Sequence, residues 1–97
     1  MNEEKMKIFS ELFSKKDLKR MELVDDYLNN YGSLILKRTV SPNRVFVLLS
    51  KKYEFTGIGV RYILEKAGVY KGKDNPVCYP TDEEKAAKPS YFFPQNI

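Results

Sequence analysis

Basic and aromatic side chains concentrate between residues 41 and 73, and these residue types are suited to recognising phosphates and bases. This segment carries seven Lys or Arg and two Asp or Glu, a formal charge of +5, whereas the whole chain carries +4. Lysine and arginine neutralise phosphates, and arginine can also pair with guanine through two parallel hydrogen bonds. The residues expected to contact nucleic acid are Arg44, Lys51, Lys52, Thr56, Gly57, Ile58, Arg61, Tyr62, Lys71 and Lys73.

The residue types that catalysis and metal binding need are scarce. The chain has one Cys and no His, the commonest general base and metal ligand. Its five glycines do not have the spacing of a phosphate-binding loop. Asp25 and Asp26 form an acidic pair, but with no third ligand nearby we expect both on the solvated face of a helix. We therefore expect no enzyme activity, no cofactor and no metal site.

A helix predicted from Pro42 to about Tyr53 would position the first group of basic residues. Ser41 can cap the backbone N–H groups at its start, and proline suits the first helical position. The residues expected to face inward are Val45, Phe46, Leu48 and Leu49, which leaves Arg44, Lys51 and Lys52 on the outside. Ordinary solubilising charge is an equally good explanation for any single one of these three.

A second helix is predicted over residues 57–67, with Thr56 as its cap and Gly68 as its end. Gly57 and Gly59 each weaken it by about 1 kcal/mol relative to alanine. Either a close approach to DNA or another backbone needs these small residues, or packing alone holds the helix. The inward face would be Val60, Ile63, Leu64 and Ala67.

The turn between the two helices shows a pattern of residue classes. Ser50 supplies a small residue in the first helix, Phe55 an apolar residue after the turn, and Thr56 the cap. Over residues 42–68 the pattern resembles the helix-turn-helix of bacterial and phage DNA-binding proteins. Glu54 stands where that family usually has glycine. The turn must therefore accept a left-handed backbone at a cost of about 1 kcal/mol, or take a different shape.

The resemblance implies a role for each helix. The helix over 57–67 would read the major groove, and the first helix would cross the DNA backbone with its basic residues on phosphates. This predicts a small protein that binds double-stranded DNA, either a transcriptional regulator or a mobile-element accessory factor. The alternative is a non-enzymatic protein-interaction module of the same shape, in which Tyr62 and the aromatic tail contact a partner.

The N-terminal part of the chain predicts further helices. Residues 1–32 have two amphipathic stretches, the second beginning with a capping box at Ser14 and ending at Gly32 as a left-handed cap. Residues 33–40 predict a short strand because of their β-branched residues, with a further helix as the alternative.

The C-terminal part predicts a small wing and a short helix. Residues 69–80 predict two extended pieces around a turn, and this resembles the wing of a winged helix, with Lys71 and Lys73 near the tip. Residues 81–97 predict a short helix that begins with a capping box at Thr81 and runs through Lys88, followed by an aromatic tail. The expected fold is therefore mainly α, a single domain over 1–97, with a helix-turn-helix bundle and a candidate β wing.

Cysteine content and hydropathy suggest a cellular location. A single Cys cannot form an internal disulfide, which favours a reducing compartment. No apolar run resembles a signal peptide or is long enough to span a membrane, so we expect no membrane partner and a cytoplasmic protein. The candidate homodimer contacts are the N-terminal helix over 3–13 and the tail over 89–97.

Overall fold

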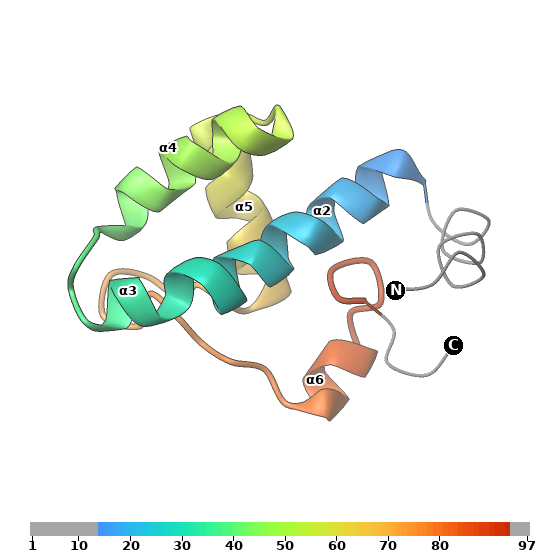
Figure 1. The fold of residues 1–97 in the computed structure, drawn as a ribbon. Helices are drawn as coiled ribbons and strands as arrows, with labels where there is room; N and C mark the ends of the chain where they lie inside the picture. The colour runs from blue at the N-terminus through green and yellow to red at the C-terminus, as the bar shows by residue number, and fades with distance from the viewer. Residues whose placement is uncertain (1–13, 94–97) are drawn as a thin grey trace.

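Three stretches of helix pack around one core in the computed structural model, which describes residues 14–93 (Figure 1). In chain order the elements are α2 (Lys15–Asp26), η1 (Tyr27–Tyr31), α3 (Gly32–Leu36), α4 (Pro42–Tyr53), α5 (Gly57–Ala67) and α6 (Asp82–Ala86). The first three run on as one rod, with α4 along one side, α5 crossing behind it and α6 on the other side (Figure 1). Contacts join α2, α4 and α5 pairwise. The prediction of a mainly α fold is confirmed.

Side-chain caps define where helices α2 and α6 begin. The Ser14 hydroxyl accepts a hydrogen bond from the Asp17 backbone N–H, and the Asp17 carboxylate accepts one from the Ser14 N–H, both at 3.2 Å. Thr81 and Glu84 form the same reciprocal pair at 3.2 Å. Both arrangements satisfy N–H groups that have no partner within the helix. The predicted capping boxes are confirmed, although α6 ends at Ala86, before its predicted end.

The core lies where α2, α4 and α5 meet. The inward face predicted for α5 is confirmed, because Val60, Ile63, Leu64 and Ala67 are all buried. Across from it, the Phe46 ring meets the Tyr70 ring edge-on with centroids 5.1 Å apart. The prediction that Leu48 faces inward is wrong, because this side chain is 46% exposed. Leu48 lies beyond the arc of α4 that α2 and α5 cover.

Residues 33–40 form helix α3 and a turn, so the strand interpretation is wrong and the helix alternative is correct. A strand needs a partner strand, and none exists within residues 14–93. Gly32 does not end the preceding helix either, since its φ of −56° is right-handed. A Cβ on Gly32 would lie 2.5 Å from the Tyr79 hydroxyl. This glycine therefore provides room for a neighbouring side chain.

The π-helical segment η1 anchors the chain that follows α5. Its Tyr27 hydroxyl donates a hydrogen bond to the Pro76 carbonyl, and the Tyr79 hydroxyl donates one to the Leu28 carbonyl at 3.3 Å. A π-helix breaks the ordinary i→i+4 bonding, and segments of this kind often serve a special contact. Here the contact holds residues 76–79 against the rod.

The candidate β wing over residues 69–80 has no strand in the part of the chain that the structure describes. Instead, the Asn75 N–H donates to the Gly72 carbonyl at 3.2 Å, and the Lys71 N–H donates to the Asn75 carbonyl at 2.9 Å. Beyond this turn, the Cys78 N–H donates to the Val69 carbonyl at 2.9 Å. The segment is a folded-back loop, because isolated backbone bonds of this kind do not make a ladder.

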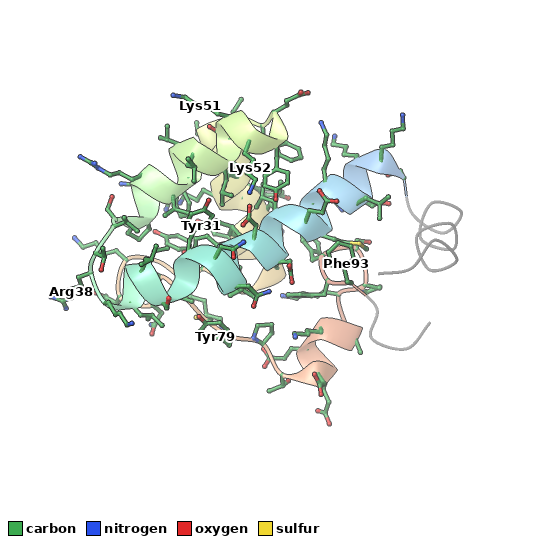
Figure 2. All side chains as sticks on the ribbon, viewed as in Figure 1. Tyr31, Arg38, Lys51, Lys52, Tyr79 and Phe93 are labelled. Atoms are coloured by element: carbon green, nitrogen blue, oxygen red, sulfur yellow. The ribbon has the colours of Figure 1, made fainter. Side chains whose placement is uncertain are left out.

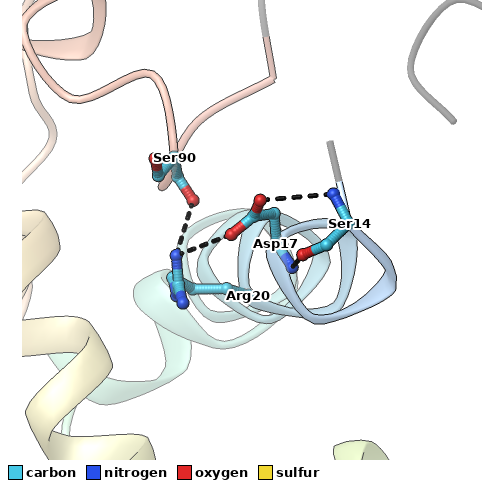
Figure 3. Close-up of polar contacts among 4 residues, drawn as sticks. All are labelled: Ser14, Asp17, Arg20 and Ser90. Atoms are coloured by element: carbon cyan, nitrogen blue, oxygen red, sulfur yellow. Dashed lines mark hydrogen bonds and ion pairs between the residues drawn. The ribbon is translucent and has the colours of Figure 1, made fainter. Parts of the chain in front are cut away.

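The aromatic tail folds back on α2 as far as the structure describes it. The Arg20 guanidinium lies 5.0 Å from the centre of the Tyr91 ring, and Phe92 is only 7% exposed. Arg20 also donates to the Ser90 carbonyl at 3.5 Å and contacts Asp17 at 3.1 Å (Figure 3). The predicted helix over 3–13 and the last residues of the tail lie outside the described residues.

Candidate nucleic-acid interface

The turn between α4 and α5 takes the left-handed backbone that the resemblance implies. Glu54 has φ 59° and ψ 43° and follows directly after the last residue of α4. The Phe55 N–H then donates to the Ser50 carbonyl at 2.9 Å, which closes the end of the helix. The Glu54 carboxylate lies 3.5 Å from the Lys19 ammonium on α2. This exposed pair adds little stability, so the surrounding fold maintains the turn despite the backbone cost.

Thr56 begins α5 as predicted. Its hydroxyl accepts a hydrogen bond from the Gly59 N–H at 2.9 Å. A Cβ on Gly59 would lie 3.0 Å from this hydroxyl oxygen, so glycine leaves room for the cap. A Cβ on Gly57 would meet nothing within 4 Å. Packing therefore gives a reason for Gly59 and none for Gly57.

The outer face of α5 presents a row of side chains with i, i+3, i+4 and i+7 spacing. Ile58 is 84% exposed and Tyr62 is 57% exposed. Arg61 lies between them in the row and Glu65 ends it, and both are exposed. Since the other face of α5 is buried, this row and the exposed Gly57 and Lys66 beside it are the part of the helix that a ligand could reach. The structure therefore brings together the four expected residues Gly57, Ile58, Arg61 and Tyr62 on one exposed surface.

Arg61 is held in place by its own helix. Its Nε donates to the Glu65 carboxylate at 2.8 Å, and its guanidinium carbon lies 5.9 Å from the centre of the Tyr70 ring. The hydrogen bond to Glu65 raises the pKa of Arg61. The two terminal nitrogens make no hydrogen bond to any described residue. The contact with Glu65 thus orients the side chain, and the donors needed for pairing with a base stay available.

Lys52 is bound to Asp26, a buried acid. Asp26 is 5% exposed, so the expectation that it faces solvent is wrong. Its carboxylate accepts hydrogen bonds from Lys52 at 2.6 Å, the Tyr53 hydroxyl at 2.9 Å and Asn30 at 2.5 Å. Burial alone would raise the Asp26 pKa, but these bonds outweigh it and the pKa is lowered. Figure 2 shows Lys52 pointing from α4 toward the rod.

The remaining expected cations are exposed but come from separate elements. Arg44 and Lys51 lie on the outer face of α4, and neither forms an ion pair with any described residue. Lys71 and Lys73 are exposed on the loop after α5. Figure 2 shows Lys51 extending from α4 on the side opposite the rod. The positive charge therefore divides between α4 and the loop, while Lys52 is used within the fold.

Arg38 is a further exposed cation that the sequence pattern did not indicate as a binding residue. Arg38 has φ 60°, in the left-handed region, lies in the turn after α3 and is exposed. It lines a groove of about 510 Å³ together with Lys73 and Asp74 from the loop and Pro42 at the start of α4. These residues are far apart in the sequence, so the sequence pattern does not predict the groove. The only local signal was the turn-like end of the apolar run before Arg38.

The structure offers no other obvious chemistry in its described part. Residues 14–93 contain no group of three or more acidic or Cys side chains placed to hold a metal ion. No helix among them is both long enough and apolar enough to cross a membrane. Comparisons with protein-family models, with curated proteins and with solved structures each find no match for this chain.

Proposed function

We propose that this chain binds duplex DNA and inserts the outer row of α5 into the major groove. The observation that carries the proposal is the α4–turn–α5 unit, in which a left-handed Glu54 and a Thr56 cap set two helices against one core. The row from Ile58 to Glu65 then faces outward on α5, beside the exposed Gly57 and Lys66. An α-helix fits the width of the major groove, and residues near its N-terminus contact base edges.

Each expected residue has a role in this proposal. Arg61 pairs with guanine, and Tyr62 and Ile58 contact thymine methyl groups or the DNA backbone. Thr56 and Gly57 allow close approach at the start of the helix. The free cations of α4 and the loop (Arg44, Lys51, Lys71 and Lys73) contact phosphates, and Lys52 assists only where its bond to Asp26 permits. A protein of this kind acts as a transcriptional regulator or as an accessory factor of a mobile element.

The first test is fluorescence anisotropy with labelled generic duplex DNA at low and moderate salt. The wild type is compared with Arg61→Ala/Lys51→Ala, and with Lys85→Ala on α6 as a variant that loses charge elsewhere. We expect binding that falls steeply with salt, because cations displace counterions from the phosphates. We also expect a loss of at least about tenfold in the double variant and little change in the control.

Two results would contradict the proposal. One is no binding by the wild type at low salt. The other is an equal loss of affinity in the double variant and in Lys85→Ala, since that would mean that net charge, not the α5 face, determines binding. If binding is confirmed, selection from a random duplex library would next define the site, with Arg61→Ala expected to relax preference at one guanine.

A further inference from the structure

We propose that the outer face of α4 docks an acidic amphipathic helix from a partner protein. Val47 and Leu48 are adjacent on this face and are 52% and 46% exposed. Arg44 lies one turn before them and Lys51 one turn after, so the four residues form a stripe with i, i+3, i+4 and i+7 spacing. These residues and Asn43 line one shallow depression. We call these four side chains the α4 stripe.

DNA binding leaves the centre of the α4 stripe unexplained. Arg44 and Lys51 can form ion pairs with DNA phosphates, but aliphatic side chains form no favourable contact with a phosphate. Val47 and Leu48 contribute favourable free energy only when another apolar surface covers them and removes them from water. Single exposed apolar residues are ordinary, whereas an adjacent pair between two cations is a small amphipathic surface. A partner for this surface must therefore supply both apolar side chains and negative charge.

The charge of the α4 stripe indicates which kind of partner fits it. Helix α4 contains no Asp or Glu, and its two outer cations have no ion-pair partner among residues 14–93. A second copy would place Arg44 and Lys51 against the same two cations, whichever way two such helices lie, and like charges repel. An anionic membrane would match the charge. However, two medium-sized aliphatic residues are less apolar surface than an interfacial helix normally buries. A helix with a Leu or Ile row between Glu or Asp residues matches both features.

The experiment uses the full chain and displayed libraries of cross-linked helical peptides that vary at apolar and flanking positions. Selected peptides are then measured by fluorescence anisotropy. We expect selection to enrich Asp and Glu on both sides of an apolar row. We expect Val47→Ser/Leu48→Ser to weaken the best peptide by at least about tenfold. Leu36→Ser, which changes a comparably exposed leucine (54%) outside the stripe, should leave the affinity unchanged.

A charge reversal separates docking from a structural role. Arg44→Glu/Lys51→Glu should no longer bind the acidic peptide. It should instead bind a version of the peptide in which lysines replace the flanking acids. A variant that had merely unfolded would bind neither peptide. The proposal does not rest on DNA binding, because Arg61→Ala should leave peptide affinity unchanged even though it abolishes the proposed contact with guanine.

Several outcomes would overturn the proposal. One is that every selected peptide binds Val47→Ser/Leu48→Ser as tightly as it binds the wild type. Another is that the wild type binds the basic and the acidic peptides equally well. A concentration-dependent mass in sedimentation that the same double variant abolishes would assign the stripe to a second copy. Co-sedimentation with phosphatidylserine vesicles that the double variant abolishes would assign it to a membrane surface.

Discussion

Helices α4 and α5 expose stripes with the same spacing but opposite organisation. On α4 the two cations lie at the ends of the stripe, the apolar pair lies between them, and neither cation is paired within the described residues. On α5 the stripe begins with Ile58 and ends with Glu65, which holds Arg61. One helix therefore offers free charge around an apolar centre, and the other offers an arginine that is already oriented. The number of basic residues in the sequence does not distinguish these two helix faces.

Lys51 and Lys52 are neighbours in the sequence, but one is free and the other is bound within the fold. Lys51 faces solvent, whereas Lys52 reaches a carboxylate that is almost fully buried on another helix. The difference shows that a count of basic residues overstates the charge available to DNA. It also gives a direct way to change that charge, because removing the buried partner should free Lys52.

The largest expected effect comes from Asp26→Ala. This change leaves the Tyr53 hydroxyl and the Lys52 ammonium without their acceptor, and we expect a loss of about 2 kcal/mol in the free energy of unfolding. Chemical denaturation measures the loss. Asp25→Ala removes the same charge from an exposed position and should cost less than about 0.5 kcal/mol. If Lys52 is released, DNA affinity should rise more in Asp26→Ala than in this control, and an equal rise would contradict that interpretation.

The same carboxylate should make stability depend on acid pH. The Asp26 pKa lies below its ordinary value of 3.8 because the hydrogen bonds it accepts outweigh burial. The unfolded chain therefore takes up the proton first as the pH falls. The stability that the carboxylate supplies is present above pH 3.8 and is lost as the pH falls below that value through the folded pKa. Denaturation of wild type and Asp26→Asn across this range should show their difference shrinking, and a constant difference would contradict the prediction.

A smaller effect is expected at the turn. Glu54→Gly removes the left-handed penalty and should stabilise the chain by about 1 kcal/mol, because only the weak contact with Lys19 is lost. Thermal unfolding would measure this gain. Arg38→Gly is the matched comparison, since Arg38 has nearly the same positive φ, 60° against 59°. Destabilisation by Glu54→Gly alone would mean that the contact with α2 contributes more than its exposure suggests.

A change at the first residue of α5 should affect stability and binding in opposite directions. A methyl group on Gly57 meets nothing, so Gly57→Ala should stabilise the fold by about 0.4–1 kcal/mol. It should also weaken DNA binding if the backbone approaches the duplex here. Gly59→Ala is the contrasting variant, because its Cβ crowds the Thr56 cap and should destabilise the helix. Anisotropy and thermal unfolding on both variants test the pair, and unchanged DNA affinity in Gly57→Ala would argue against close approach.

The smallest effect is expected from Glu65→Gln. It removes the negative charge that opposes phosphates and loosens the hold on Arg61, whose pKa should then fall toward its ordinary value. We expect stability to change little, because both side chains are exposed, and DNA affinity to rise a few-fold. Glu83→Gln on α6 makes the same charge change away from α5. A similar rise in both variants would show that Glu65 acts only through net charge.

The helix boundaries were predictable from the sequence because the interactions that set them are local. Ser14, Ser41, Thr56 and Thr81 each accept a hydrogen bond from a backbone N–H three residues further on. Gly68 ends α5 with φ 79° for the same local reason. At Glu54 the sequence left two alternatives, a left-handed backbone or a turn of different shape, and the structure has the left-handed one. The exposed row of α5 followed in turn from the helical period and the apolar face.

The tertiary structure decided the features that depend on contacts between distant residues. Asp26 is buried because Lys52 and Tyr53 reach it from another helix. Gly32 lies within the rod with a right-handed backbone, and Tyr79, far along the chain, occupies the space where a side chain at this position would lie. Residues 33–40 have no partner strand within residues 14–93 and continue the rod as α3 and a turn. The sequence by itself determined that α2, α4, α5 and α6 are helical and where they begin, because those interactions span a few residues. Which charges remain free for a ligand was decided only when α4 packed against α2, because a buried acid binds whichever cation the fold brings within reach.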